Sequence, residues 1–306
     1  MGGDGVAPII AIYNVVDGSV DTTVINANHV SDVDTIKIDG VSQTVASKYS
    51  LSAGQHTIKI KLKNMVTISD GMFQNVTALT ECRIPNSFTT TGTSAFAGSG
   101  LEKIYIPSSI TVIRNYSFNT NSLKEVHIED IGAWCRIDIQ YNNAGTNPLN
   151  NAHHLYINGT EIIDLVVPSG ITSLTKTFWG ASSIRSTQLP DSITDIGAYA
   201  FGSCGSLNAI NIPEGVTSIG NMGFDGAKIS VLTLPSTLTT IGNYAFRNNN
   251  TLSSITCLAI TPPTIGSMTF YNTNGCPIYV PSESVETYKA AQNWSSIASR
   301  IQAIPT

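Results

Sequence analysis

A repeat of 22–24 residues, marked by phenylalanine and proline at the same step, constrains this chain more than any other feature. Apart from Phe88, phenylalanines fall at positions 73, 96, 118, 178, 201, 224, 246 and 270, and one proline series falls at 85, 107, 168, 190, 213 and 235. Both series are interrupted by the same long gap, between 118 and 178 and between 107 and 168. This agreement predicts a repeat architecture, in which each unit is one supersecondary element.

The clearest units begin at Leu207, Ile229 and Leu101 and read LNAINIPEGVTSIGNMGFDGAK, ISVLTLPSTLTTIGNYAFRNNN and LEKIYIPSSITVIRNYSFNTNS. They share the form LxxIxIPxxϕTxIGxxxF, in which ϕ is aliphatic. LxxIxI predicts a short strand that pairs with its copies in a parallel ladder, and Pro, which lacks an N–H, ends that strand. One unit cannot bury its apolar side alone, so we expect stacked units to share one continuous core.

Two features of the second half of the unit carry further expectations. Gly197, Gly220 and Gly242 are expected at a turn that needs a positive φ. The regular spacing of the phenylalanines predicts that each ring packs over the ring of the preceding unit.

The segments IPEGVTSIGNMGF and LPDSITDIGAYAFGSCGSL resemble the leucine-rich repeats of the BspA-like (Treponema-type) family. The resemblance extends over about residues 62–306, and residues 131–168, with AWC and LYING, are similar to a lengthened unit of that family. It implies a right-handed solenoid of 22–23-residue units, displayed outside bacterial cells and associated with adhesion. No catalytic residues come with the family.

The chain divides by pattern into several segments. We predict a leader at 1–6, a small β-sandwich-like domain at 7–60 and a mostly β solenoid at 61–306, which includes a lengthened unit at 123–160 and a C-terminal cap at 256–306. The last strand of the N-terminal domain, His56 to Leu62, is expected to pair with the first repeat and cover the open end of the core. In the cap, apolar residues every third position from Val285 to Ile297 predict a short helix, with Ser282 as its N-cap.

Composition narrows the function classes. Only 12% of residues are charged and the net charge is −5, so a basic stripe for nucleic acid is not expected. No apolar run is long enough to cross a membrane, and the start MGGDGVAPII has no basic region of a signal peptide. The resemblance implies display outside bacterial cells, and we accordingly expect a monomer at the bacterial surface or outside the cell, whose export signal or anchor has been removed.

Chemistry-bearing residues are sparse. The five cysteines show no CxxC spacing, which favours buried free thiols over a metal or redox pair. His153 and His154 are adjacent and would point to opposite sides of a strand. A Cys135 nucleophile with His127 or His153 lacks an orienting acid. We predict no enzyme activity, no metal and no cofactor.

A ligand-binding face is a better hypothesis. The residues on either side of the first Ile of LxxIxI point away from the core and should stack in two columns. The N-terminal part of these columns is charged and aromatic, and the later part is small and neutral. The residues expected to contact a partner are Arg83, Lys103, Tyr105, Glu125 and His127. Aromatic residues of the lengthened unit, Trp134, Tyr141 and Tyr156, form a second candidate. Ordinary solvated residues in the columns, and local packing of these aromatics, are the alternatives.

Three functions remain open from the sequence. The first is an interaction protein that binds a host or bacterial surface protein or a glycan on its concave sheet. The second is a passive spacer that displays another module, in keeping with the small neutral residues of the later columns. The third is a polysaccharide hydrolase, which lacks a carboxylate pair in a suitable pocket.

Overall fold

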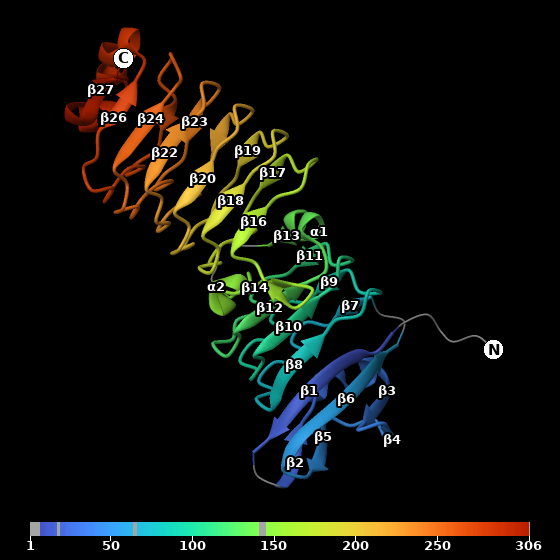
Figure 1. The fold of residues 1–306 in the computed structure, drawn as a ribbon. Coiled ribbons are helices and arrows are strands. Elements are labelled where there is room, and N and C mark those ends of the chain that lie inside the picture. The colour runs from blue at the N-terminus through green and yellow to red at the C-terminus, as the bar shows by residue number, and fades with distance from the viewer. Residues whose placement is uncertain (1–6, 17–18, 64–65, 141–144, 306) are drawn as a thin grey trace. The chain divides into compact units, whose positions relative to one another are not determined.

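The computed structural model describes residues 7–16, 19–63, 66–140 and 145–305, which form two compact units, residues 1–161 and 162–306. Both units consist mainly of short strands joined by turns (Figure 1). Strand residues (31%) outnumber helical residues (11%), which confirms the predicted mostly-β class.

In the first unit each repeat contributes one strand to each of two parallel ladders. The LxxIxI segment forms the first ladder, as the repeat pattern predicts. The ϕTxI segment, for which only a turn was expected, forms the second ladder. The first ladder contains β8 (Leu79–Arg83), β10 (Lys103–Ile106), β12 (Glu125–Ile128) and β14 (Leu155–Ile157), and the second contains β7 (Thr67–Ile68), β9 (Thr90–Thr91), β11 (Val112–Ile113) and β13 (Asp138–Ile139).

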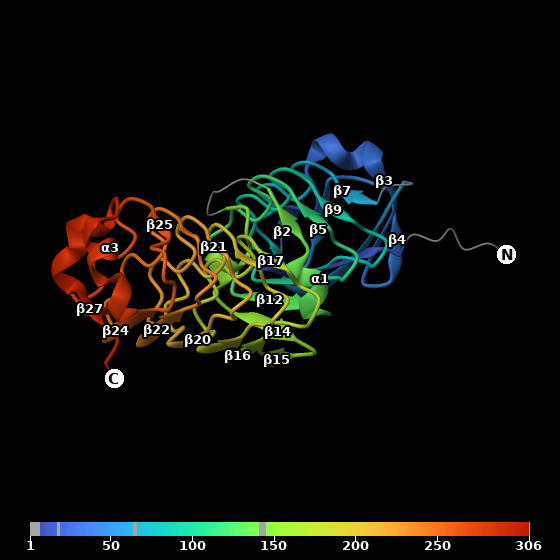
Figure 2. The same cartoon turned by 90° about the horizontal axis from the view of Figure 1, so that it is seen from above.

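The second unit repeats this arrangement, and Figure 2 shows its two series of strands along different sides of the unit. The repeat strands that follow the LxxIxI pattern form two sheets, β16-β18-β20 and β22-β24-β26, and β27 of the C-terminal cap joins the edge of the second. The ϕTxI strands form one sheet. The bounds are β16 (Asp164–Val166), β18 (Ser186–Gln188), β20 (Ala209–Asn211), β22 (Val231–Leu234), β24 (Ser254–Cys257), β26 (Ile278–Val280) and β27 (Ile301–Ala303), then β17 (Ser173–Leu174), β19 (Asp195–Ile196), β21 (Ser218–Ile219), β23 (Thr240–Ile241) and β25 (Thr264–Ile265).

The phenylalanines stack in each unit as the spacing predicts. Ring centroids of Phe73, Phe96 and Phe118 lie 5.2 and 5.3 Å apart in the first unit. In the second unit the column from Phe178 to Phe270 has separations of 5.3 to 5.7 Å. All of these rings are buried, so each unit hides its aromatic side chains against the next copy of the repeat.

The expectation of a positive φ at the repeat glycines is wrong. Gly220 and Gly242 have ordinary φ values, but a Cβ at Gly220 would lie 2.5 Å from the backbone nitrogen of Ala198. Glycine is therefore needed because the preceding unit's backbone approaches closely. The positive φ falls two residues later, on Met222 (φ 54°) and Tyr244 (φ 57°).

The N-terminal strands join the first ladder through β1 (Ile9–Val15), which pairs antiparallel with β8. The prediction that His56 to Leu62 pairs with the first repeat is wrong, because β6 (Gly54–Leu62) has β1 on one side and β3 (Val33–Ile38) on the other. The buried Tyr13 of β1 donates a hydrogen bond to the carbonyl of Val24, 2.6 Å away. The remaining elements are β2 (Ser19–Thr23), η1 (Ala27–Asp32), β4 (Val41–Gln43) and β5 (Lys48–Leu51).

The lengthened segment inserts two short helices, α1 (Ile131–Cys135) and α2 (Leu149–Ala152), between β12 and β14. Asp130 caps α1, because its side chain accepts a 2.6 Å hydrogen bond from the backbone N–H of Ala133. The chain then returns to the ladder, with Leu155 opposite Val126, and β15 (Thr160–Glu161) closes the sheet edge antiparallel to β14.

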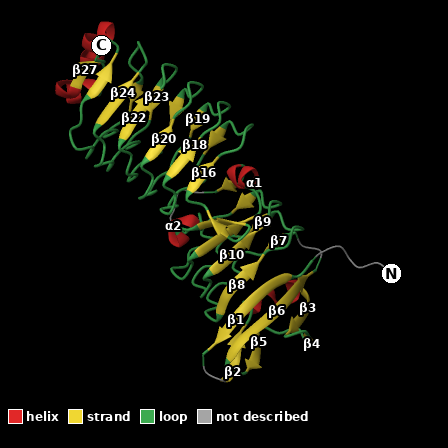
Figure 3. Cartoon of the chain, in the orientation of Figure 1, coloured by secondary structure: helices red, strands yellow, loops and turns green. Residues whose placement is uncertain are grey.

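The C-terminal cap contains short helical pieces instead of the single predicted helix, and Figure 3 draws them in red near the C-terminus. They are α3 (Val285–Ala290), preceded by the 3-10 turn η2 (Ser282–Ser284), and η3 (Trp294–Arg300). The break lies where Ala291 is extended and Asn293 has a φ of 65°, and Ser282 does not cap α3. Within the described ranges, no helix combines the length and apolar character needed to cross a bilayer.

Candidate binding face

The strands of the first ladder align the predicted side chains in two columns. Tyr105 lies opposite Arg83 on one neighbouring strand and His127 on the other. Lys103 lies opposite Glu81 and Glu125 in the same way. Because side chains alternate between the faces of a strand, both columns point away from the core that Ile104 and Val126 enter.

The first column continues into the lengthened segment, because Tyr156 of β14 lies opposite His127. The rings of Tyr105 and His127 stack with centroids 4.4 Å apart, and those of His127 and Tyr156 with centroids 4.7 Å apart. The guanidinium carbon of Arg83 lies 3.7 Å from the centroid of the Tyr105 ring. We call these four residues, Arg83, Tyr105, His127 and Tyr156, the aromatic ladder.

The geometry of the aromatic ladder determines which ring atoms face solvent. Both faces of Tyr105 are covered, by Arg83 and by His127, and both faces of His127 are covered by the tyrosines. Tyr105 and His127 therefore display ring edges and polar tips, while Tyr156 ends the stack and is covered by a ring on one face only. Such stacking and cation–π contacts contribute about 0.5–1.5 kcal/mol each beyond burial.

The second column pairs its charges within the face. A nitrogen of Lys103 lies 2.9 Å from Glu125, and His127 Nε2 lies 2.8 Å from the other carboxylate oxygen of Glu125. The hydrogen bond with Glu125 raises the pKa of Lys103, although burial acts in the opposite direction. Burial alone would raise the pKa of Glu125, but the hydrogen bonds from Lys103 and His127 outweigh it and hold that pKa below its usual value.

A further pair lies beside the ladder, where Arg83 contacts Glu81 at 2.7 Å. Burial of Tyr156 raises the pKa of its hydroxyl, and the nearby carboxylates of Glu161 and Glu125 add to this effect. The tyrosine is therefore neutral and can donate a hydrogen bond at neutral pH. The face as a whole presents fixed side chains whose charges are balanced locally.

A groove of about 310 Å³ runs beside the aromatic ladder. Three ladder residues line the groove, together with other residues of the strands and of the turns that follow them. None of these other residues was predicted from the sequence to contact a ligand. The walls of the groove include Arg83, Tyr105, His127, Pro107, Glu129 and Asn158. Glu129 accepts hydrogen bonds of 2.9 Å from the backbone N–H and the hydroxyl of Ser108, so its carboxylate is held at the groove wall.

The second group of predicted aromatic residues does not gather at one place. Trp134 lies in α1 and is only 1% exposed, so its ring packs inside and offers no contact surface. Tyr141 lies outside the described residues. Tyr156 belongs to the aromatic ladder, so this residue of the lengthened unit is part of the predicted binding face on the strands.

The corresponding columns of the second unit carry different side chains. One column holds Val166, Gln188, Asn211, Thr233 and Thr256, and the other holds Asp164, Ser186, Ala209, Val231 and Ser254. Val166 and Val231 are 59% and 53% exposed. The first column continues to Tyr279 of β26, opposite Thr256, and then to Gln302 of β27. Tyr279 therefore has no ring beside it in the column, and the only carboxylate is Asp164 of the other column, so the described residues form no comparable ladder.

Reactive groups are buried or scattered. All five cysteines are buried and free of disulfides, and burial raises the pKa of the Cys135 thiol to about 12. That thiol is protonated at neutral pH and is a weak nucleophile. Among the described residues, no cluster of three or more His, Cys, Asp or Glu side chains has a metal-binding arrangement.

A family model described as a BspA-type leucine-rich repeat region matches residues 44–135 and 158–296 in six copies, well over half of the chain. The chain belongs to the BspA-type leucine-rich repeat family. The match indicates a repeat protein, and it does not point to a catalytic family. No curated protein matches the chain.

Several solved structures resemble this BspA-type chain. A leucine-rich repeat protein from Bacteroides ovatus is 19% identical over 81% of this chain, with a TM-score of 0.45. The pneumococcal vaccine antigen PcpA is 13% identical over 78% of this chain, with a TM-score of 0.44. A leucine-rich cell surface protein from Faecalibacterium prausnitzii is 20% identical over 72% of this chain and 65% of its own, with a TM-score of 0.38.

The chain spans 62% of the length of the Bacteroides ovatus protein and 76% of that of PcpA. The TM-scores are all below 0.5, so these likenesses do not bear on the ligand of the BspA-type repeats described here.

Proposed function

We propose that this chain is an interaction protein of the bacterial surface or the extracellular space, with a right-handed solenoid as its scaffold. Its ligand docks on the sheet face that carries the aromatic ladder, in an adhesion-like role. In this proposal residues 7–60 cap one end of the repeats and residues 256–306 cap the other. The pairing of β1 with β8 and of β27 with β26 supports the two capping roles.

The observation that carries the proposal is the fixed stack of Arg83, Tyr105, His127 and Tyr156 beside a groove of about 310 Å³. Tyr and Arg dominate the energetics of protein interfaces, especially where neighbours hold them rigid. A side chain that is already ordered loses little rotamer freedom on binding, which lowers the cost of association. The aromatic ladder has this property on an otherwise polar surface.

The same stack favours a protein ligand over a glycan at this face. A sugar that stacks on an aromatic residue needs an open ring face, and the faces of Tyr105 and His127 are covered. The exposed edges instead offer hydroxyl groups and one guanidinium, which suit backbone carbonyls and carboxylates of a protein. The groove beside them accepts an apolar side chain against Pro107.

A passive role is the second candidate, and it concerns the sheet face of the second unit. The small neutral residues of its columns, such as Asn211 and Thr233, provide no fixed anchor. We propose that this face acts as a spacer surface and contributes little binding energy.

The test is a binding screen of the purified chain against matrix proteins, mucins and bacterial surface proteins, followed by variants. Tyr105→Ala and Tyr156→Ala are expected to weaken the strongest interaction by about 2 kcal/mol each, roughly 30-fold, the size of an interface hot spot. Asn211→Ala and Thr233→Ala serve as matched controls in the second unit and should leave the affinity unchanged. Equal affinity in all four variants would place the ligand elsewhere.

A further inference from the structure

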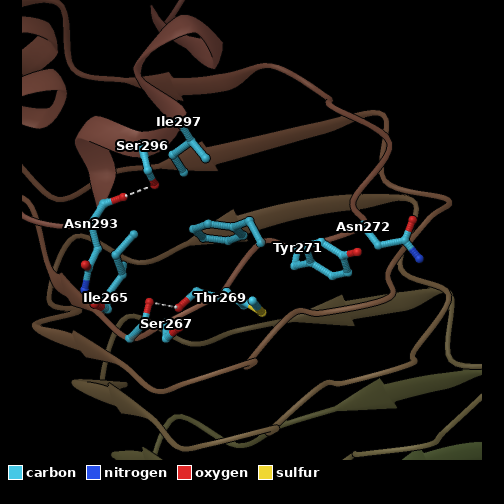
Figure 4. Close-up of a pocket in the computed structure, with 11 residues that line it drawn as sticks. Ile265, Ser267, Thr269, Tyr271, Asn272, Asn293, Ser296 and Ile297 are labelled. Atoms are coloured by element: carbon cyan, nitrogen blue, oxygen red, sulfur yellow. Dashed lines mark hydrogen bonds between the residues drawn. The ribbon is translucent and has the colours of Figure 1, made fainter.

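A second cavity, of about 450 Å³, lies within the C-terminal cap of the second unit, between the turn at 265–272 and the start of η3. Figure 4 shows Tyr271 and Asn272 on one side of it and Asn293, Ser296 and Ile297 on the other. This cavity, here called the cap pocket, falls in the size range of small-molecule sites, which is about 300–1,000 Å³. Nothing in the aromatic ladder or its groove belongs to it.

The lining of the cap pocket contains no acidic, basic or histidine side chain. Its polar groups are the amides of Asn272 and Asn293 and the hydroxyls of residues such as Ser267 and Ser296. A charged ligand would lose its hydration here without gaining an opposite charge, which is unfavourable. The groups present can still donate and accept neutral hydrogen bonds.

The apolar part of the lining is exposed to an unusual degree. Tyr271 is 59% exposed and Met268 is 55% exposed, whereas most large apolar side chains of this unit are buried. No ring stacks on Tyr271 within the described residues, in contrast to the ladder tyrosines. An aromatic residue with one polar tip and an open ring suits a ligand that has both hydroxyl groups and a C–H surface.

The rim of the cap pocket is held in place by hydrogen bonds. Asn293, with a φ of 65°, donates from its side-chain amide to the carbonyl of Ile265 at 2.6 Å. Ser296 donates to the carbonyl of Asn293 at 2.6 Å. The buried indole of Trp294 donates to the carbonyl of Pro263 at 2.8 Å and packs against Phe270, with ring centroids 5.7 Å apart.

Two hydroxyl groups of the lining are available to a ligand. The side chains of Ser267 and Tyr271 form no hydrogen bond with another described residue. A fully apolar ligand would cover these two hydroxyls without satisfying them, and an unsatisfied buried polar group is destabilising. A neutral polar ligand with an apolar face satisfies both requirements.

We propose that the cap pocket binds an uncharged sugar residue of a glycan, with its C–H face against Tyr271 and its hydroxyls toward the amide and hydroxyl side chains. Acidic sugars are excluded by the absence of a basic partner, and peptides with charged side chains by the same argument. This site is separate from the aromatic ladder, so the two interactions are independent.

Saturation-transfer-difference NMR on the whole chain tests this inference, with neutral oligosaccharides of glucose, galactose, mannose and N-acetylglucosamine as probes. Oligogalacturonate and sialyllactose provide the acidic contrast. We expect a neutral probe to bind, Tyr271→Ala to weaken it at least 10-fold, and Tyr271→Trp to retain it. Tyr116→Ala removes an exposed tyrosine of the first unit, and this change should have no effect.

Three results would overturn the inference. The first is that no neutral probe binds at concentrations up to about 10 mM, which corresponds to a binding free energy near 3 kcal/mol. The second is that only the acidic probes bind. The third is that a neutral probe binds and Tyr271→Ala leaves this binding intact. Tyr105→Ala separates this site from the proposed ladder face, because it should leave saccharide binding unchanged even if it abolishes protein binding.

Discussion

The two units build the same repeat and display different surfaces. In the first unit the outward column of the LxxIxI strands is Arg83, Tyr105 and His127, followed by Tyr156. In the second unit the equivalent column is Val166, Gln188, Asn211, Thr233 and Thr256, which are uncharged and place no ring beside another ring. The phenylalanine columns stack in the same way in both units. The core positions are therefore fixed by stacking, and the outward positions are free to vary with function.

Substitutions in the phenylalanine columns, which both units share, are expected to have the largest effect on stability. Phe96→Ala in the first unit and Phe201→Ala in the second should each lower the free energy of unfolding by about 3–5 kcal/mol, because each leaves a cavity in a stacked column. Urea unfolding followed by circular dichroism measures this loss. Tyr116→Ala, an exposed control, should stay within about 0.5 kcal/mol. If only one of the two phenylalanines mattered, the units would not share one kind of core.

The next largest effect on stability is expected at the glycines where the backbones of neighbouring repeats approach each other closely. Gly220→Ala should cost about 1–3 kcal/mol of unfolding free energy, because the new Cβ would lie 2.5 Å from the backbone nitrogen of Ala198 and force a backbone shift. Gly205→Ala is the matched control, since its new methyl group would have no atom within 4 Å and its φ is not positive. Thermal unfolding of both variants decides the point, and equal stability would mean that the glycine is not needed for packing.

Substitutions in the outward-facing columns, in which the two units differ, are expected to have a smaller effect on stability. A double-mutant cycle on Tyr105 and His127 should give a coupling of about 0.5–1.5 kcal/mol, from stacking of their rings. The matched cycle on Val231 and Ser254, which are opposite each other in the second unit, should give a coupling near zero. A coupling of similar size in both cycles would show that the ladder is not a special feature of the first unit.

The smallest effect is the dependence on pH. The pKa of Glu125 is lower in the folded chain than its unfolded value near 4.3, so its contribution is present above that value and is lost as the pH falls through the folded pKa. Lys103 is partly exposed, so this contribution stays below about 1 kcal/mol. Glu125→Gln should reduce the acid sensitivity of the first unit, measured by urea unfolding at pH 7 and pH 3. An unchanged difference between the two pH values would contradict this assignment.

The repeat and its core could be predicted from the sequence because stacking imposes one spacing on every copy. The same regularity placed Lys103 and Tyr105 on the outward face, since alternation along a strand leaves no other choice once Ile104 is buried. Tyr156 could not be assigned to that column in advance, because the pattern does not say where the lengthened segment re-enters the ladder. The structure places Leu155 opposite Val126, which decides it.

The remaining departures have a common physical origin in contacts between segments distant in sequence. Both β1 and β6 alternate between buried and less buried residues, so only tertiary pairing shows that β1 joins the repeats. Trp134 looks like a display residue by composition, and its burial depends on how α1 packs. The cap helix has a suitable apolar spacing, yet the chain breaks near Asn293, whose side chain bonds to the carbonyl of Ile265.

The most direct test of the difference between the two faces is hydrogen–deuterium exchange of the whole chain, with and without the strongest protein partner from the screen. The ladder account predicts slower amide exchange in β8, β10, β12 and β14 and no change in β18, β20, β22 and β24. Protection confined to the strands of the second unit would contradict it.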